Sequence, residues 1–162
     1  MTMRRQASLY LDDVPVVEDL RLRFNPAQAV LIPAHITLCR EDEVSHWFAF
    51  EDRVRSVLPI AVTLKFGPPV RDGDLVYLPA VGSTQSFDRL RHDLLELVGK
   101  SPRKHLPHIT IIHPRNGFCT DEIYAQIADC VTPFTATFHE ISLIEQNDGG
   151  VWNCLKRFRD PR

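Results

Sequence analysis

Apolar residues along the chain follow two spacings, one typical of strands and one typical of amphipathic helices. Strands are predicted over residues 7–11, 30–39, 60–66, 75–80, 106–112, 134–146 and 151–158. Helices are predicted over residues 14–24, 43–58, 84–98 and 120–131. Turn-rich stretches such as GPPVRDGD and NDGG separate successive strands and favour antiparallel pairing. The pattern therefore predicts an α+β fold and not a doubly wound parallel sheet.

One short motif occurs twice on predicted strands. His35-Ile36-Thr37 lies in IPAHITLCR, and His108-Ile109-Thr110 lies in LPHITIIHP, nearly half the chain further on. Because strand side chains alternate between two faces, the histidine and threonine of each copy share one face and the isoleucine lies on the other. Each half of the chain supplies strands, helices and one copy, which supports a duplicated lobe.

The two copies carry a plausible set of catalytic groups. If the strands lie side by side, both imidazoles and both hydroxyls meet in one cleft. Two histidines can act as general base and general acid near neutral pH, and hydroxyls can donate hydrogen bonds to phosphate oxygens. We therefore predict His35 and His108 as catalytic residues, with Thr37 and Thr110 binding phosphate. A single copy would favour an ordinary buried strand instead, but two copies argue against that interpretation.

The paired His-x-Thr motifs, their separation and the chain length resemble the two-histidine (2H) phosphoesterase superfamily, which includes 2′-5′ RNA ligase-like proteins and cyclic nucleotide phosphodiesterases. The resemblance implies a single bilobal domain over residues 1–162, with two pseudo-symmetric lobes of mostly antiparallel sheet flanked by helices around a central cleft. It also implies opening of a cyclic phosphodiester, with reverse 2′-5′ ligation in RNA ligase-like members. After the second motif this chain reads IIHPR, where many RNA ligase-like relatives have a leucine, a small residue and an arginine.

Composition and charge narrow the range of partners. The net charge of −2 gives no overall basic field for a long nucleic acid, so a nucleotide or an RNA end is the better substrate. We see no signal peptide and no apolar run long enough to cross a membrane. Cys39, Cys119, Cys130 and Cys154 form no C-x-x-C pair, which disfavours a zinc ribbon and predicts reduced thiols in the cytoplasm. We expect a monomer without a cofactor.

Three histidines around the second motif could suggest a metal centre. On a continuous strand His105 and His108 point to opposite faces, and eight residues place His105 about 26 Å from His113. We therefore predict no metal site there.

Further residues near the motifs have two possible roles each. A basic group flanks the second motif and forms either a solvated loop or a rim that attracts phosphate. Its members are Lys100, Arg103, Lys104 and Arg115. Tyr77, Phe118 and Trp152 are candidates for stacking on a base, although each is more typical of a core position. Cys39 shares the predicted face of His35, so it either borders the cleft or packs in the core.

These observations predict a metal-independent phosphoesterase that acts on a 2′,3′-cyclic phosphate or a related nucleotide or RNA phosphodiester. One histidine takes a proton from water and the other protonates the leaving ribose oxygen, in an order that the sequence leaves open. The alternative is a non-catalytic binder of nucleotides or RNA ends. The presence of both histidines argues against it, because a binder needs no proton transfer.

Overall fold

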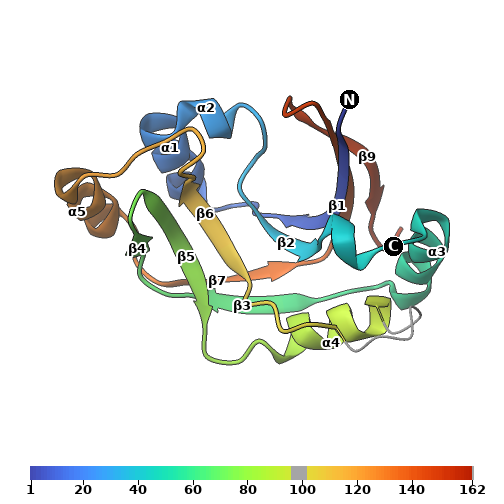
Figure 1. The fold of residues 1–162 in the computed structure, drawn as a ribbon. Coiled ribbons are helices and arrows are strands. Elements are labelled where there is room, and N and C mark those ends of the chain that lie inside the picture. Colours follow the sequence, from blue (N-terminus) through green and yellow to red (C-terminus); the bar gives the residue numbers. More distant parts are fainter. Residues whose placement is uncertain (96–101, 162) are drawn as a thin grey trace.

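The computed structural model describes residues 1–95 and 102–161, in which two antiparallel sheets are flanked by helices (Figure 1). The first sheet has the order β2-β1-β8-β9, from β2 (His35–Cys39), β1 (Met3–Tyr10), β8 (Ile141–Asn147) and β9 (Trp152–Phe158). The second has the order β4-β5-β3-β7, from β4 (Val70–Asp72), β5 (Leu75–Val81), β3 (Val62–Phe66) and β7 (Phe134–Phe138), and β6 (His108–Ile112) also pairs with β5. The predicted α+β fold is confirmed.

Apart from α2, which was not predicted, the helices overlap the predicted ones, and α3 begins later than the predicted residue 43. They are α1 (Pro15–Phe24), α2 (Pro26–Ala29), α3 (Trp47–Val57), α4 (Gln85–Leu95) and α5 (Asp121–Cys130), with a short 3₁₀ turn over Glu41–Glu43. Residues 96–98 of the predicted helix 84–98 lie outside the described residues. The Thr120 hydroxyl accepts a hydrogen bond from the Ile123 amide at 3.2 Å, as an N-cap does. The dipeptide Asn25-Pro26 ends α1 and begins α2, because proline fits the first turn of a helix.

The two halves of the chain repeat one unit. In β1-α1-β2 and again in β5-α4-β6, a helix connects two strands that pair with each other antiparallel. Each helix also packs against the motif strand of the other unit, α1 against β6 and α4 against β2. The apolar faces of both units therefore join in one hydrophobic core, which includes Leu20, Ile36, Leu90 and Ile109.

The structure corrects three predicted strands. The predicted strand 134–146 is two strands, because β7 pairs in the second sheet and β8 in the first, with a break at residues 139–140. The motif strands begin at the histidines and not at residues 30 and 106. Pro33, two residues before His35, and Pro107, directly before His108, have no N–H to pair with a neighbouring strand. The stretch GPPVRDGD also contains the three-residue strand β4, which was predicted only as a turn.

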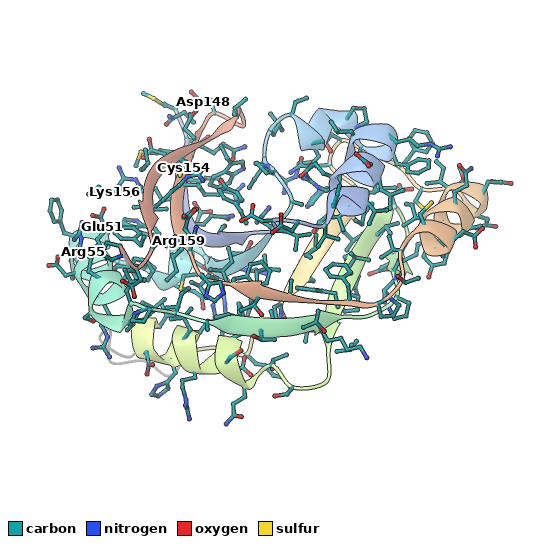
Figure 2. The ribbon with its side chains drawn as sticks, turned by 180° about the vertical axis from the view of Figure 1, so that it is seen from behind. Glu51, Arg55, Asp148, Cys154, Lys156 and Arg159 are labelled. Atoms are coloured by element: carbon teal, nitrogen blue, oxygen red, sulfur yellow. The ribbon has the colours of Figure 1, made fainter. Side chains whose placement is uncertain are left out.

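The C-terminal hairpin β8–β9 forms one edge of the first sheet. Figure 2 shows this hairpin from behind, turned by 180° from the view of Figure 1. Its predicted turn is confirmed, with left-handed backbone at Asp148 (φ 51°) and Gly149 (φ 72°). An ion pair of 2.6 Å between Lys156 and Glu51 joins β9 to α3. Within the two described ranges, no helix is long and apolar enough to cross a membrane.

Candidate active site

The two motif strands have the same pairing pattern. In β2, Thr37 pairs with Ser8 of β1, and in β6, Thr110 pairs with Tyr77 of β5. The register then shifts directly after each threonine, so both strands carry an irregularity at the same point. Burial follows the motif in both strands, since histidine and threonine are partly exposed and the following isoleucine or leucine is buried.

This register shift decides the position of Cys39. A regular strand would place Cys39 on the face of His35, but after the shift it pairs with Ala7, whose side chain belongs to the core. Cys39 is fully buried, and burial raises the pKa of its thiol. Of its two possible roles, packing in the core is therefore confirmed.

Both motif histidines are oriented by the same backbone contact. His35 Nδ1 lies 2.8 Å from the carbonyl oxygen of Pro33, and His108 Nδ1 lies 3.0 Å from that of Leu106. Because a carbonyl oxygen can only accept, each Nδ1 carries the proton, and each Nε2 of a neutral ring keeps a free lone pair. A tyrosine edge packs on each ring, with Tyr10 centred 6.5 Å from His35 and Tyr77 centred 5.6 Å from His108.

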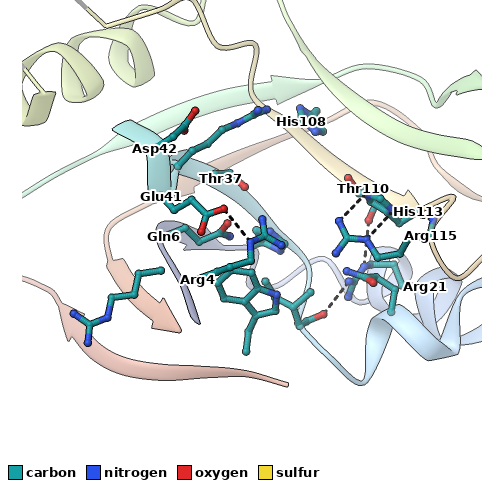
Figure 3. Close-up of a pocket in the computed structure, with 16 residues that line it drawn as sticks. Arg4, Gln6, Arg21, Thr37, Glu41, Asp42, His108, Thr110, His113 and Arg115 are labelled. Atoms are coloured by element: carbon teal, nitrogen blue, oxygen red, sulfur yellow. Dashed lines mark hydrogen bonds and ion pairs between the residues drawn. The ribbon is translucent and has the colours of Figure 1, made fainter. Parts of the chain in front are cut away.

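The structure brings all four predicted motif side chains together. His35, Thr37, His108 and Thr110 line one cavity of about 460 Å³ between the two sheets (Figure 3). The Cα atoms of β2 and β6 approach within 8 Å, although the strands do not pair. The cavity is therefore formed where the two repeated units meet, as the shared strand faces predicted.

An ion pair on α1, between the buried Arg21 and the partly exposed Glu18, joins the backbone of β6 to the segment just before β2. Arg21 is 3% exposed and donates hydrogen bonds to the carbonyl oxygens of Ile32 (2.8 Å) and Thr110 (3.2 Å). Its partner Glu18 accepts a hydrogen bond of 2.8 Å from the Ala34 amide, next to His35. These contacts fix the spacing between the two sides of the cavity.

A second ion pair is placed in a similar way on α4. Arg91 is 2% exposed and donates to the carbonyl oxygen of Leu38 in β2 at 2.6 Å. The Arg91 guanidinium also lies 2.6 Å from Glu43, and it donates to the backbone of Arg103 at 3.0 Å. Arg21 and Arg91 are each the seventh residue of their helices, and each binds the motif strand of the other unit. Sequence reasoning missed both, although an arginine within the apolar stripe of each helix was the available signal.

The surroundings of His35 favour its neutral form. Burial lowers the pKa of His35 to about 4, opposed by the hydrogen bond to Pro33 and assisted by the positive charge of Arg21. His113 also lines the cavity, and burial followed by the charge of Arg115 lowers its pKa. A neutral imidazole at position 35 can accept a proton at neutral pH.

The predicted basic rim is only partly present. Arg115 lines the cavity, whereas Arg103 and Lys104 are exposed outside it and Lys100 lies outside the described residues. Arg103 instead forms an ion pair with Asp42 at 2.8 Å. The other cavity arginines come from segments that the sequence did not single out. They are Arg4, Arg5, Arg21 and Arg40.

The three aromatic candidates have different positions. Trp152 lines the cavity, with the Arg4 guanidinium 5.4 Å from its ring centre. Tyr77 packs against His108 and does not line the cavity, while Phe118 is 64% exposed elsewhere. Of these three, Trp152 alone lines the cavity, but it is buried and packs with Ile32 and Ile144, as a core residue does.

The three histidines considered for a metal are arranged differently from the prediction. Because β6 begins at His108, strand alternation does not extend to His105, and the two ring centres lie 6.1 Å apart. His105 is buried against Phe87, and its pKa is lowered to about 4 by burial and by the charges of Arg91 and Arg40. Among the described side chains, no group of three or more His, Cys, Asp or Glu residues could hold a metal ion.

Comparisons with known proteins agree with this fold. A crystal structure described as a phosphoesterase is 16% identical, covers 98% of both chains and has a TM-score of 0.63. LigT from E. coli in complex with phosphate is 18% identical, with 97% of this chain and 96% of that chain covered and a TM-score of 0.60. LigT in complex with 3′-AMP is 15% identical, with 99% of both chains covered and a TM-score of 0.60.

The family comparison gives the assignment. A search of curated proteins found no match. The family model described as the 2′-5′ RNA ligase superfamily matches residues 11–150, a range that contains both His-x-Thr motifs. The chain therefore belongs to the 2′-5′ RNA ligase superfamily, the two-histidine phosphoesterases that its motifs resemble.

Proposed function

We propose that this protein is a phosphoesterase that opens a 2′,3′-cyclic phosphate on a nucleotide or an RNA end by acid–base catalysis. The observation that carries the proposal is the meeting of both His-x-Thr motifs in one cavity, with both histidine rings held through Nδ1. Each Nε2 is then available for proton transfer. The complexes of LigT with phosphate and with 3′-AMP add support, because they show nucleotide and phosphate binding by a relative of this fold.

We assign the base to His35 and the acid to His108. In the proposed step, neutral His35 takes a proton from water while the water oxygen forms a bond to phosphorus. The bond from phosphorus to one ribose oxygen breaks, and His108, which must enter the step protonated on both ring nitrogens, gives its Nε2 proton to that oxygen. Thr37 and Thr110 donate hydrogen bonds to the non-bridging oxygens, where negative charge accumulates. Ligation would use the 5′ hydroxyl of a second RNA end in place of water: His35 takes the proton of that hydroxyl, its oxygen bonds to phosphorus, and His108 again protonates the leaving ribose oxygen.

The function is tested by a turnover screen of 2′,3′-cyclic nucleotides, RNA with a 2′,3′-cyclic phosphate end and 2′-5′ dinucleotides, with EDTA present. We expect opening of at least one cyclic phosphate and no effect of EDTA, because side chains supply both proton transfers. Binding without turnover would favour the alternative, a non-catalytic binder. Loss of turnover in EDTA would contradict a metal-independent mechanism.

The lowered pKa of His35 predicts an unusual pH profile. A base must be neutral, so on the acid side of the profile activity is lost when the pH falls below the pKa of His35 in the free enzyme. We expect kcat/KM to stay near its full value as the pH falls through 6.5, the ordinary pKa of histidine, and to decline only as it approaches about 4. Stopped assays from pH 3.5 to 8, with the fold checked by circular dichroism at each pH, measure this limb.

His105 supplies the control for this profile, because its pKa is also lowered to about 4. The variant His105→Phe removes that titration and preserves an aromatic ring against Phe87. The acid limb should be unchanged in this variant if His35 is the base. A limb centred near pH 6.5 in the native protein would contradict the assignment of His35.

A further inference from the structure

The cavity is more positive than the opening of one phosphodiester requires. Its lining contains two carboxylates and a larger set of guanidinium groups. The arginines are Arg4, Arg5, Arg21, Arg40 and Arg115, and the carboxylates are Glu41 and Asp42. Such an excess is notable because the chain as a whole has a net charge of −2. Positive charge is therefore concentrated in this cavity.

Several of these charges are already compensated by protein partners. Arg5 forms an ion pair of 2.6 Å with Glu145, and the Arg21 guanidinium is bound by Glu18 and two backbone carbonyls. Asp42 pairs with Arg103 outside the cavity. The arginines that remain for a ligand are thus fewer than the lining suggests.

Among the side chains that the structure describes, Arg115 has no negative partner. Within residues 1–95 and 102–161, the hydrogen bonds of its guanidinium are to His113, with Nε 3.1 Å from Nδ1 and an Nη nitrogen 3.0 Å from Nε2. Burial and then the positive charge of Arg4 lower the pKa of Arg115, so two like charges face the same space. Figure 3 shows Arg4 and Arg115 below His108 and Thr37 in that view, with Arg4 to the left and Arg115 to the right.

Arg4 lines the cavity opposite Arg115. Its guanidinium lies 5.4 Å from the centre of the Trp152 ring and 3.1 Å from Glu41, in an ion pair whose two side chains are 41% and 45% exposed. Such an exposed pair is worth about 1 kcal/mol or less, so a bound anion can compete for Arg4. Trp152 restricts the side chain without neutralising its charge.

Arg4 and Arg115 are each several residues along the chain from the position of a motif threonine. Arg4 is four residues from Ser8, the partner of Thr37, which is about 13 Å along β1. Arg115 follows the end of β6, five residues after Thr110. An anion between Arg4 and Arg115 is therefore separate from a phosphate held by Thr37 and Thr110.

We propose that Arg4 and Arg115 form a second anion subsite, so that the preferred substrate carries another phosphate on the 5′ side of the nucleotide that is opened. In a ribonucleotide whose 2′ and 3′ oxygens share the cyclic phosphate, the 5′ oxygen is the remaining position for one. The inference rests on the proposed function and names its substrate class. The second phosphate is either a terminal monoester or the bridging diester of an RNA end.

Steady-state kinetics test the subsite through a ratio of two substrates. The substrates are adenosine 2′,3′-cyclic phosphate with and without a 5′-phosphate, and a dinucleotide with a 2′,3′-cyclic end tests the bridging diester. We expect a 5′-phosphate to raise kcat/KM about 10- to 100-fold, the size of hydrogen bonds to a charged group. Arg115→Met and Arg4→Met should bring this ratio close to one, because methionine keeps an apolar stem but no charge.

The matched control is Arg55→Met, on the outer side of α3 (Figure 2). Arg55 is 52% exposed, pairs with Asp52 and does not line the cavity. This variant should keep the native ratio. A native ratio near one, or a ratio that Arg115→Met and Arg4→Met leave unchanged, would overturn the subsite.

Calorimetric binding separates this inference from the function itself. Adenosine 3′,5′-bisphosphate should bind the native protein about 10- to 100-fold more tightly than 3′-AMP, and Arg115→Met should remove the difference. If this difference persists while no cyclic phosphate is opened, the proposed function fails and the subsite stands. If cyclic phosphates are opened but the two ligands bind equally, the subsite fails and the function stands.

Discussion

Replacement of His35 or His108 by alanine is expected to lower kcat by about 10²–10⁴, the usual contribution of a general acid or base. The two rings line one cavity and act in one proton-transfer cycle. The double variant should therefore lose much less than the product of the single losses. Measured kcat for each variant on the opened cyclic phosphate, in EDTA, gives these factors.

His46→Ala provides the matched control for this series. His46 is exposed at the start of α3, outside the cavity, so the same chemical change there should leave kcat unaltered. Thermal unfolding should confirm that the cavity variants remain folded, since both motif histidines are partly exposed. Native turnover by His108→Ala on the true substrate would end the two-histidine mechanism.

Arg91→Met is expected to destabilise the fold by about 3–5 kcal/mol, the range for removing one partner of a buried ion pair. The Arg91 and Glu43 side chains are 3% and 8% exposed. Burial acts to raise the pKa of Glu43, but the hydrogen bond from Arg91 and others lower it overall, so its carboxylate is charged at neutral pH. Without Arg91 this carboxylate and the Leu38 carbonyl each lose a donor, and the carboxylate keeps the Arg40 amide at 3.0 Å and the longer contact to Arg103 at 3.7 Å.

Urea unfolding at pH 7 measures this loss. Arg55→Met is again the control, because its exposed ion pair should contribute about 1 kcal/mol or less. Adding Glu43→Leu to Arg91→Met should recover part of the lost stability, since no charged carboxylate then remains buried. A loss below about 1 kcal/mol for Arg91→Met would show that the pair does not hold β2 in place.

The meeting of the motif residues could be predicted because it depends on strand alternation alone. His35 and Thr37 occupy positions two apart, and so do His108 and Thr110, so each pair shares a face in any regular strand. Two identical arrangements with apolar opposite faces then imply one common cleft. The same reasoning was wrong where regularity ends, since it predicted continuous strands through Pro33 and Pro107.

Other features depend on contacts between distant segments. The position of Cys39 depends on a register shift against Ala7, and alternation within β2 gives no sign of it. Arg4 reaches the cavity because β1 pairs with both β2 and β8, which are far apart in the sequence. Arg21 and Arg91 bind backbone carbonyls of another unit, and carbonyl groups have no sequence signature. The chain passes from the second sheet to the first between β7 and β8. This change of sheet likewise depends on distant pairing partners, since β7 pairs with β3 and β8 with β1.

The pairing of β1 with β8 has a consequence for biosynthesis. β1 leaves the ribosome long before β8, yet they are adjacent, with Met3 opposite Asn147. Until residues 141–158 have emerged, β1 has β2 as its only neighbour of the three other strands in that sheet. A two-stranded ribbon is marginal in water, and closing such a long loop is slow. The lobe that contains His35 is therefore completed only after residues 141–158 have emerged, and the nascent chain keeps apolar strand surface exposed until then.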